Sequence, residues 1–316
     1  MPKGPRFEDI APGLDVPPLV RPIGMLEIVR FAAYSETLGL LHIDKDFARQ
    51  KLGYPDVNVQ GSLKMAMLCT MLTGWAADTG ALARFSCRYR GMDYCGDTLS
   101  ARAKVVKTYK QDGAGHVECD VWVENQRGER ATTGSATLTF PPVRTNAAPA
   151  RSEGGGTGPT ESGARGSLLT PEVRAMVGRE SAPTTEQVER GAVRRWTKAT
   201  FDASPLHTDE SYARASAYKC LVAPPSYLHA IAKDFMDEAQ DLHIPVTAKQ
   251  RVAGGEDWEF FLPILVGDII TRRQKIADIY EKQTKARTML FIVTEISYSN
   301  QRGELAALAR NTSIAY

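Results

Sequence analysis

A carboxylate and an imidazole five residues apart are the side chains in this sequence best suited to acid–base chemistry. Asp202 and His207 flank a short loop that contains Pro205. Proline stiffens such a turn, so both side chains can be held towards one point. Facing one water molecule, the two groups could divide the removal and the delivery of a proton between them. The alternative is a pair that only closes the loop, because Asp often caps turns.

Three short patterns recur in the same order in the two halves of the chain. They are H-x-D-x-x-[FY]-A-R at His42 and His207, Gly-Asp at Gly96 and Gly267, and the pentapeptide NQRGE at Asn125 and Asn300. The separation between the two copies grows slowly along the chain, as loop insertions would produce. Chance can supply one such match, but three in the same order indicate a duplicated domain.

The elements that must position these residues follow the same order in both halves. Each half is expected to begin with an amphipathic stretch, at 26–40 and 186–200, which leads into the loop that carries the histidine. A longer helix follows, at 61–77 with hydrophobic residues at helical spacing, and at 225–240 after prolines that suit a first helical turn. Strand-like runs rich in Val, Ile, Thr and Tyr come next, at 83–89, 98–109, 116–125 and 130–140 in the first half and at 257–262, 268–280, 287–299 and 304–315 in the second.

One long helix followed by several antiparallel strands indicates an α+β fold, in which the sheet of each half curls around a buried helix. A chain of 316 residues is long enough for two such domains. We place the first domain at 1–143 and the second at 169–316. The segment 144–168 is rich in Gly, Ser, Ala and Pro, and it cannot offset its ordering entropy by burial. We interpret it as a flexible linker, with an active-site lid as the alternative.

The composition argues against several classes of partner. Lys and Arg (39) nearly balance Asp and Glu (37), so no nucleic-acid surface is indicated. No run of 18 hydrophobic residues occurs, and the N-terminus lacks the apolar core of a signal peptide. The five cysteines show no CxxC spacing, which favours free thiols over disulfides or a zinc site. We expect a cytoplasmic protein with no metal, no nucleic-acid partner and no membrane partner.

Together these patterns resemble the tandem members of the MaoC-like dehydratases, the family of the (R)-specific 2-enoyl-CoA hydratases. Asp202, Pro205 and His207 match the hydratase motif Asp-x-x-Pro-x-His, and the segments VQGSLKMAML at 59–68 and LVAPPSYL at 221–228 resemble those that open the central helix. The resemblance implies a double hot-dog fold and reversible hydration of a 2-enoyl-CoA thioester to a 3-hydroxyacyl-CoA. It implies no cofactor, with CoA or an acyl-carrier protein bearing the substrate, and we expect a homodimer.

The resemblance also assigns roles within the site. Adding water to an enoyl thioester requires a base, an acid and donors that stabilise the charge growing on the thioester oxygen. Asp202 and His207 would be the acid–base pair, and the oxygen would be bound by a backbone N–H at the start of the central helix. In the second half that position is Pro225, which has no N–H, so the amide or hydroxyl of Ser226 is expected to replace it.

The first half departs from the motif in the opposite way. It keeps Gly61 at the helix start, but Thr37 stands at the position of the catalytic Asp, and Glu36 is one position away. We therefore expect one active site per chain, in the second half. The alternative layout uses Glu36 and His42 beside Gly61. Two other functions stay open: an acyl-CoA thioesterase, and a non-catalytic acyl-binding subunit that supports a dehydratase partner.

Overall fold

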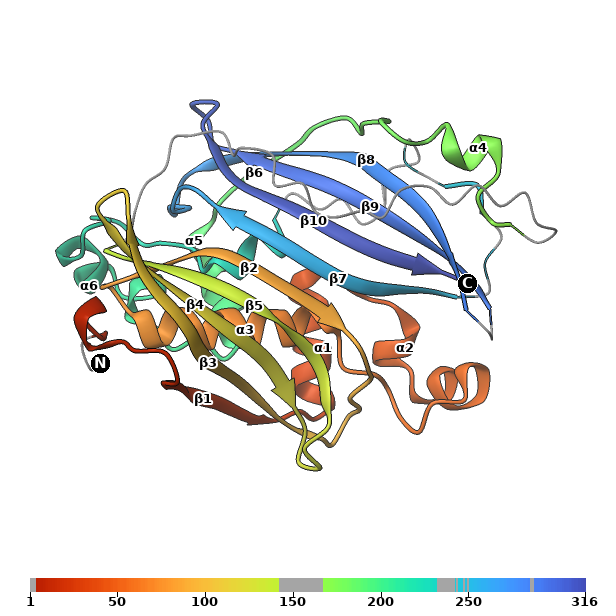
Figure 1. Ribbon diagram of the computed structural model, residues 1–316, viewed down its shortest axis with the longest axis horizontal. Coiled ribbons are helices and arrows are strands. Elements are labelled where there is room, and N and C mark those ends of the chain that lie inside the picture. Colours follow the sequence, from red (N-terminus) through yellow and green to blue (C-terminus); the bar gives the residue numbers. More distant parts are fainter. Residues whose placement is uncertain are drawn as a thin grey trace.

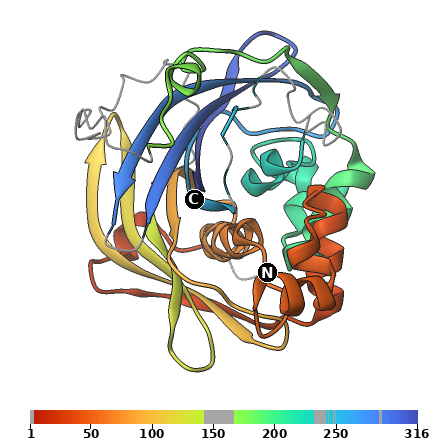
Figure 2. The same ribbon diagram turned by 90° about the vertical axis from the view of Figure 1, so that its right-hand side faces the viewer.

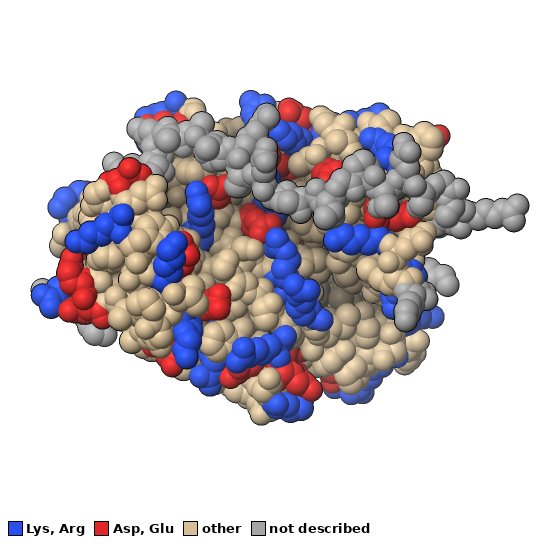
Figure 3. Space-filling model, viewed as in Figure 1, with Lys and Arg blue, Asp and Glu red and all other residues tan. Residues whose placement is uncertain are grey.

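The computed structural model describes residues 4–141, 167–231, 242, 244–246, 248, 250–284 and 287–316. Within these residues the strands form one antiparallel sheet of ten strands, in the order β1-β3-β4-β5-β2-β7-β10-β9-β8-β6. The sheet curves around the helices, which lie on its inner side (Figures 1 and 2). On the face shown in Figure 3, basic and acidic side chains are interspersed, in keeping with the small net charge.

The two halves contribute similar series of elements to this roll. The first half contains η1 (Phe7–Asp9), β1 (Asp15–Pro22), α1 (Met25–Ser35), α2 (Leu40–Ile43), η2 (Phe47–Lys51), α3 (Gly61–Ala76), β2 (Ala81–Tyr89), β3 (Thr98–Gln111), β4 (Ala114–Glu124) and β5 (Arg130–Phe140). The second contains α4 (Pro171–Arg174), β6 (Thr184–Gln187), α5 (Arg190–Ala199), η3 (Pro205–His207), α6 (Glu210–Ala215), η4 (Pro225–His229), β7 (Arg251–Phe260), β8 (Ile269–Gln283), β9 (Thr288–Ser299) and β10 (Leu305–Ala315).

Helix α3 lies inside the roll that the sheet forms (Figure 2). Most of its residues are buried, from Ser62 to Leu72 without a break. A helix that is hydrophobic on all sides belongs in a core, because no face of it gains from contact with water. Its single charged residue, Lys64, is also buried. The expected helix at 61–77 is therefore confirmed, and it is the element against which both halves pack.

The half-sheets join at β2 and β7, where Ser86 pairs with Asp257. The Ser86 hydroxyl donates to Asp257 Oδ1 at 2.6 Å, and Arg88 donates to Asp257 Oδ2 at 2.9 Å. Side chains alternate between the faces of a strand, so the neighbouring residues Cys87 and Glu256 are buried on the other, inner face. This junction turns two half-sheets into one continuous sheet.

The repeated Gly-Asp and NQRGE patterns form the same structure in both halves. Asp97 accepts a hydrogen bond from the Tyr94 N–H, and the Gln126 side chain donates to Asp97 at 2.8 Å. In the second half Asp268 accepts from the Leu265 N–H, and Gln301 donates to Asp268 at 3.0 Å. Each pattern therefore ties a hairpin end to the start of the strand beside it, which explains why the repeat is visible in the sequence.

Several expected boundaries were wrong. Strand β7 begins at Arg251 rather than at 257, and strand β6 at 184–187 overlaps the start of the amphipathic stretch expected at 186–200. Strand β1 was missed because two prolines interrupt it; they lie at a register shift in its pairing with β3, at an edge of the sheet where proline is tolerated. Of the helix expected at 225–240, the structure describes a 3₁₀ helix at Pro225–His229, and 232–240 lie outside the described residues. Most of the expected linker, 144–166, lies outside them too.

Candidate active site

The backbone after helix α5 directs Asp202 inward. Phe201 adopts a left-handed conformation (φ +62°), which ends the helix, and the Asp202 N–H donates back to the Thr197 carbonyl at 2.8 Å. A left-handed conformation costs a non-glycine residue on the order of 1 kcal/mol or more. The Asp202 carboxylate then turns back on its own loop, where Oδ1 accepts from the Ser204 N–H at 2.9 Å.

His207 is held in a single orientation beside this carboxylate. Its Nδ1 atom lies 2.6 Å from the Val222 carbonyl oxygen. A carbonyl can only accept, so Nδ1 carries the proton, and Nε2 of the neutral ring presents a lone pair. Nε2 lies 3.4 Å from Asp202 Oδ2, and the side chains of His207 and Asp202 are 5% and 3% exposed. The structure therefore brings together the pair that the sequence predicted.

The buried Asp202 carboxyl group has a higher pKa than an exposed aspartate. Burial raises its pKa, and the opposing effects of the nearby His207 and of the Ser204 N–H do not cancel the rise. Its Oδ2 atom is buried and accepts no hydrogen bond from the described residues. A buried acceptor without a partner is costly, so an oxygen–hydrogen group that bound between Oδ2 and Nε2 would gain from both atoms.

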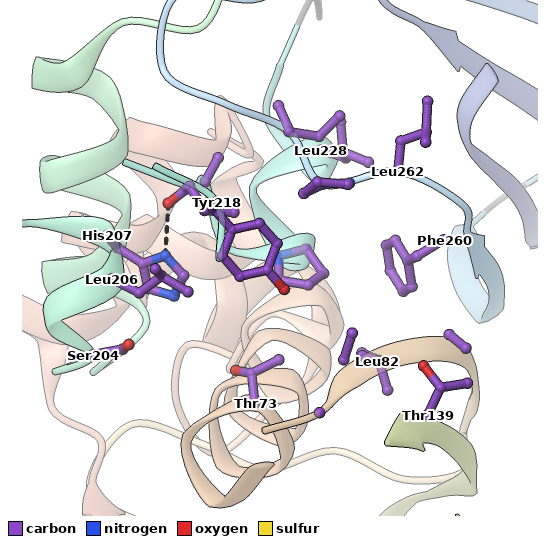
Figure 4. Close-up of a pocket in the computed structure, with 18 of the residues that line it drawn as sticks. Thr73, Leu82, Thr139, Ser204, Leu206, His207, Tyr218, Leu228, Phe260 and Leu262 are labelled. Atoms are coloured by element: carbon purple, nitrogen blue, oxygen red, sulfur yellow. Dashed lines mark hydrogen bonds between the residues drawn. The ribbon is translucent and has the colours of Figure 1, made fainter. Parts of the chain in front are cut away.

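The His207 ring lines a cavity of about 110 Å³, several times the ~30 Å³ that one water molecule occupies in the liquid. Its walls come from both halves: Thr73 and Leu82 from the first, Leu228 and Phe260 from the second (Figure 4). Most lining residues are hydrophobic; Ser204 and His207 lie together on one side of the cavity, and Thr139 lies on the other side beside Leu82 (Figure 4). Asp202 is not part of the wall and lies next to it, beside the His207 ring. This arrangement suits a hydrophobic chain with a reactive group at its polar end.

The corresponding loop of the first half keeps the histidine and lacks the carboxylate. His42 Nδ1 lies 2.7 Å from the Asn58 carbonyl oxygen, and burial lowers the pKa of His42. Glu36 has the same left-handed backbone (φ +55°) as Phe201, so Thr37 takes the place of Asp202. Glu36 itself is exposed at the end of α1, and no hydrogen bond or ion pair joins it to His42 in the described part of the chain.

A buried ion pair occupies the first-half counterpart of the cavity wall. Lys64 Nζ lies 2.9 Å from Asp93 Oδ2, and the two side chains are 2% and 0% exposed. Lys64 and Leu228 occupy equivalent positions, because each lies six residues after the residue whose carbonyl contacts the histidine, Asn58 or Val222. Asp93 and Ile264 are also equivalent, because each lies three residues before the glycine of the repeated Gly-Asp pattern. Leu228 and Ile264 both line the cavity of the second half. The two halves therefore differ at equivalent positions, with hydrophobic side chains in one and an ion pair in the other.

Gly61 has a packing role in this structure. A Cβ atom at this position would lie 2.8–3.0 Å from ring carbons of Tyr89, closer than such atoms approach.

Glu256 is the centre of a buried polar cluster that includes Tyr89. The Tyr89 hydroxyl donates to Glu256 Oε1 at 2.6 Å, and the Trp258 indole donates to Glu256 Oε2 at 3.0 Å. His229 Nδ1 lies 3.6 Å from the same Oε2. Sequence reasoning missed this buried cluster, since only the inward position of Glu256 on its strand could have indicated it.

Ser226 is directed into the core and does not line the cavity. Its hydroxyl accepts a hydrogen bond from the Trp196 indole N–H at 3.1 Å. Pro225 does line the cavity, with no N–H to offer. The expected replacement of a missing donor by the Ser226 hydroxyl thus lacks support from the geometry, while the Ser226 N–H lies at the first turn of η4.

Comparisons with known proteins match both halves of the chain to dehydratase domains. Residues 17–126 match the MaoC like domain, and residues 175–309 match the FAS1-like dehydratase domain region. The chain belongs to the MaoC-like dehydratases. As a tandem member of this family it carries one dehydratase-type domain in each half, in agreement with the repeat in its sequence.

Solved structures share the fold of this tandem MaoC-like protein. A putative MaoC domain protein dehydratase from Chloroflexus aurantiacus has a TM-score of 0.72 at 17% identity, covering 99% of this chain and 97% of the other. A conserved hypothetical protein from Mycobacterium tuberculosis, described as having a double hotdog fold, has a TM-score of 0.68 at 14% identity and covers 99% of both chains. At these identities the likeness shows the fold alone, and it confirms the expected α+β double hot-dog.

Two curated relatives each match less than half of this MaoC-like chain. A UPF0336 protein from Saccharopolyspora erythraea is 28% identical over 147 residues, or 46% of this chain and 92% of that protein. A probable enoyl-CoA hydratase alpha subunit from Thermomonospora curvata is 29% identical over 155 residues, or 44% of this chain and 49% of that protein. The family and this relative support a hydratase or dehydratase role.

The part of the chain that the structure describes contains neither a candidate membrane-spanning helix nor a candidate metal-binding cluster. None of its helices is both long and hydrophobic enough to cross a membrane. Nor do three or more His, Cys, Asp or Glu side chains gather there in a way that could hold a metal ion. The five cysteines are free thiols, and three of them are buried.

Proposed function

We propose that this chain catalyses the reversible addition of water to a 2-enoyl thioester of CoA or of an acyl-carrier protein, with Asp202 and His207 as its acid–base pair. The observation that carries the proposal is the pairing of Asp202 Oδ2 with His207 Nε2, 3.4 Å apart and buried, where the His207 ring lines a cavity with mostly hydrophobic walls. The first half, with Thr37 and an ion pair at the equivalent positions, contributes walls and no second acid–base pair.

The proton positions suggest how the pair divides the work. In the neutral His207 ring, Nδ1 donates to the Val222 carbonyl and Nε2 carries the lone pair, so Nε2 would take a proton from water as the water oxygen bonds to C3 of the enoyl group. Burial raises the pKa of Asp202, which favours a protonated carboxyl group that can deliver its proton to C2. One proton is taken and one is given, so the reaction needs no cofactor, and dehydration follows the same steps in reverse.

The test is a hydration assay with matched variants of the two halves. Purified protein would be mixed with 2-enoyl-CoA thioesters, from crotonyl to long-chain and aryl-substituted, and loss of the conjugated enoyl absorbance would be followed. We expect Asp202→Asn and His207→Ala to lower kcat by about 10²–10⁴-fold, the usual contribution of acid–base catalysis. The control is His42→Ala, which removes the equivalent first-half histidine and should leave kcat within about two-fold of wild type.

The other outcomes separate the competing functions. Release of free thiol from saturated acyl-CoA, without hydration, would indicate a thioesterase. Wild-type protein that hydrates nothing in the panel would favour a non-catalytic acyl-binding subunit, a function that the missing N–H at Pro225 keeps in view. Loss of activity in His42→Ala with full activity in His207→Ala would move the site to the first half.

A further inference from the structure

The turn that directs Asp202 inward has an unusual residue at its left-handed position. Helix α5 ends with Thr200 as its C-cap, and Phe201 follows with φ +62°. The Asp202 N–H donates back to the Thr197 carbonyl at 2.8 Å. Glycine usually occupies the left-handed position of this kind of helix end, because it has no Cβ atom. A bulky residue stays there only where the surrounding structure enforces it.

The first half of the chain holds the backbone of this turn. The Thr70 hydroxyl, on helix α3, donates to the Thr200 carbonyl at 3.2 Å. Thr70 is 7% exposed and Thr200 is 0% exposed, so the bond lies in the core. The Thr200 carbonyl and the Phe201 N–H belong to one planar peptide unit. Fixing the carbonyl oxygen therefore fixes the plane against which Phe201 makes its left-handed rotation.

A second residue of the first half lies against the side chain of the same turn. The Phe201 ring packs against the main hydrophobic core, and the guanidinium carbon of Arg21 on β1 lies 5.7 Å from the centre of the ring. That distance is within the range of cation–π attraction. The left-handed residue is thus held by its backbone through Thr70 and by its ring beside Arg21, and both residues come from the half that lacks the carboxylate.

We propose that Thr70 is a positioning residue for the acid–base pair: its hydroxyl holds the turn at Phe201 and so keeps the Asp202 carboxyl group beside His207 Nε2. This inference rests on the proposed hydratase function. Displacing a reacting group by about 1 Å can cost about 10²-fold in rate. Asp202 lies outside the cavity wall, so its displacement slows turnover more than it weakens substrate binding. The half without an acid–base pair of its own thereby controls the pair in the other half.

Four variants isolate the hydroxyl. Thr70→Val keeps the shape of the side chain and removes the donor, but it places a methyl group against the Thr200 carbonyl. Thr70→Ala removes the donor without that contact, so a folded protein without the hydroxyl can be measured even if valine is not tolerated. Thr70→Ser keeps the donor. The matched control is Thr79→Val, because the Thr79 hydroxyl donates to the Pro5 and Ala76 carbonyls, which are not part of the turn.

The first readout is steady-state hydration of an enoyl-CoA. We expect Thr70→Val and Thr70→Ala to lower kcat by about 10–10²-fold with KM little changed, and Thr70→Ser and Thr79→Val to keep the wild-type kcat. Rescue by serine assigns the loss to the hydrogen bond, because serine lacks the threonine methyl group and keeps the donor. A wild-type kcat in the two variants without the hydroxyl, or an equal loss in Thr70→Ser, would overturn the proposal.

The second readout does not depend on turnover, so it separates failure of this inference from failure of the proposed function. The Asp202 carboxyl group would be titrated by NMR in protein with ¹³C-labelled aspartate, with Asp202→Asn to assign the resonance. Burial raises the pKa of Asp202, and a loosened turn admits water to the carboxyl group. A lower pKa in Thr70→Val and Thr70→Ala, with the wild-type value in Thr70→Ser and Thr79→Val, would support the inference even if no enoyl-CoA is hydrated. The same pKa in all these proteins would refute it.

Discussion

Lys64→Leu is expected to destabilise the protein strongly, because it leaves Asp93 as a buried charge without a partner. The Lys64–Asp93 pair is almost fully buried, with 2.9 Å between Nζ and Oδ2. After the change, the Asp93 carboxylate would keep, among the described residues, a single long contact of 3.4 Å from the Asn125 amide. Breaking a buried ion pair on one side costs about 3–5 kcal/mol. Asp93→Ile should cost a similar amount, since the Lys64 ammonium would keep the Gly91 carbonyl at 3.4 Å as its one partner in the described part of the chain.

The double variant separates the cost of a lone charge from the value of the pair. Lys64→Leu/Asp93→Ile installs the residues found at the equivalent positions 228 and 264 of the second half. Replacing a buried ion pair by hydrophobic residues is commonly neutral or stabilising by about 1–4 kcal/mol. We therefore expect the double variant to be at least as stable as wild type, with a coupling energy of about 6 kcal/mol or more between the two positions.

The assay is equilibrium unfolding in guanidinium chloride followed by tryptophan fluorescence, with the free energy taken from midpoint and slope. The control is Lys45→Leu, which breaks a pair of similar length (3.0 Å to Asp56) whose side chains are 50% and 18% exposed. Exposed pairs contribute about 0–1 kcal/mol. A cost below about 1 kcal/mol for Lys64→Leu, or a double variant as unstable as the two single changes together, would refute the reasoning.

Two carboxyl groups should change acid stability in opposite directions. Burial raises the pKa of Asp202 in the folded protein, so the native protein binds that proton more tightly than the unfolded chain does. The stability of the protein therefore falls as pH rises above about 4. Thermal unfolding should show a higher Tm for Asp202→Asn than for wild type at pH 7, and equal Tm values would contradict this. Burial also tends to raise the pKa of Glu256, but His229, Tyr89 and Trp258 outweigh it and lower the pKa to about 2. This stabilisation, about 3 kcal/mol, is present above pH 4.5 and lost as pH falls towards 2. Urea unfolding should therefore give Glu256→Gln a lower free energy of unfolding than wild type at pH 7, and a smaller dependence of that free energy on pH below 4.5. The same pH dependence in variant and wild type would count against this prediction.

Much of the roll followed from local signals in the sequence. The helix at 61–76 and the strand at 130–140 lie within a residue of where hydrophobic spacing and β-forming residues placed them. The repeat was visible because the Gly-Asp and NQRGE residues make the same hydrogen bonds at each hairpin. Strand β7 was different: its first residues, Arg251 to Gly255, include two glycines and are strand because they pair with β10. Such pairing is set by a distant neighbour and leaves no local pattern.

The sequence by itself predicted which two side chains form the proposed acid–base pair and which half of the chain carries them. Asp202 and His207 are five residues apart, so the motif in the sequence already implies that their side chains lie close together. The sequence also shows directly that Thr37 stands at the matching position of the first half. The tertiary structure alone decided what surrounds that pair. It placed Leu82 of the first half opposite Phe260 of the second in one cavity. The reason is physical: hydrogen bonds within a loop depend on neighbouring residues, whereas a cavity and its buried charges depend on contacts between segments far apart in the chain.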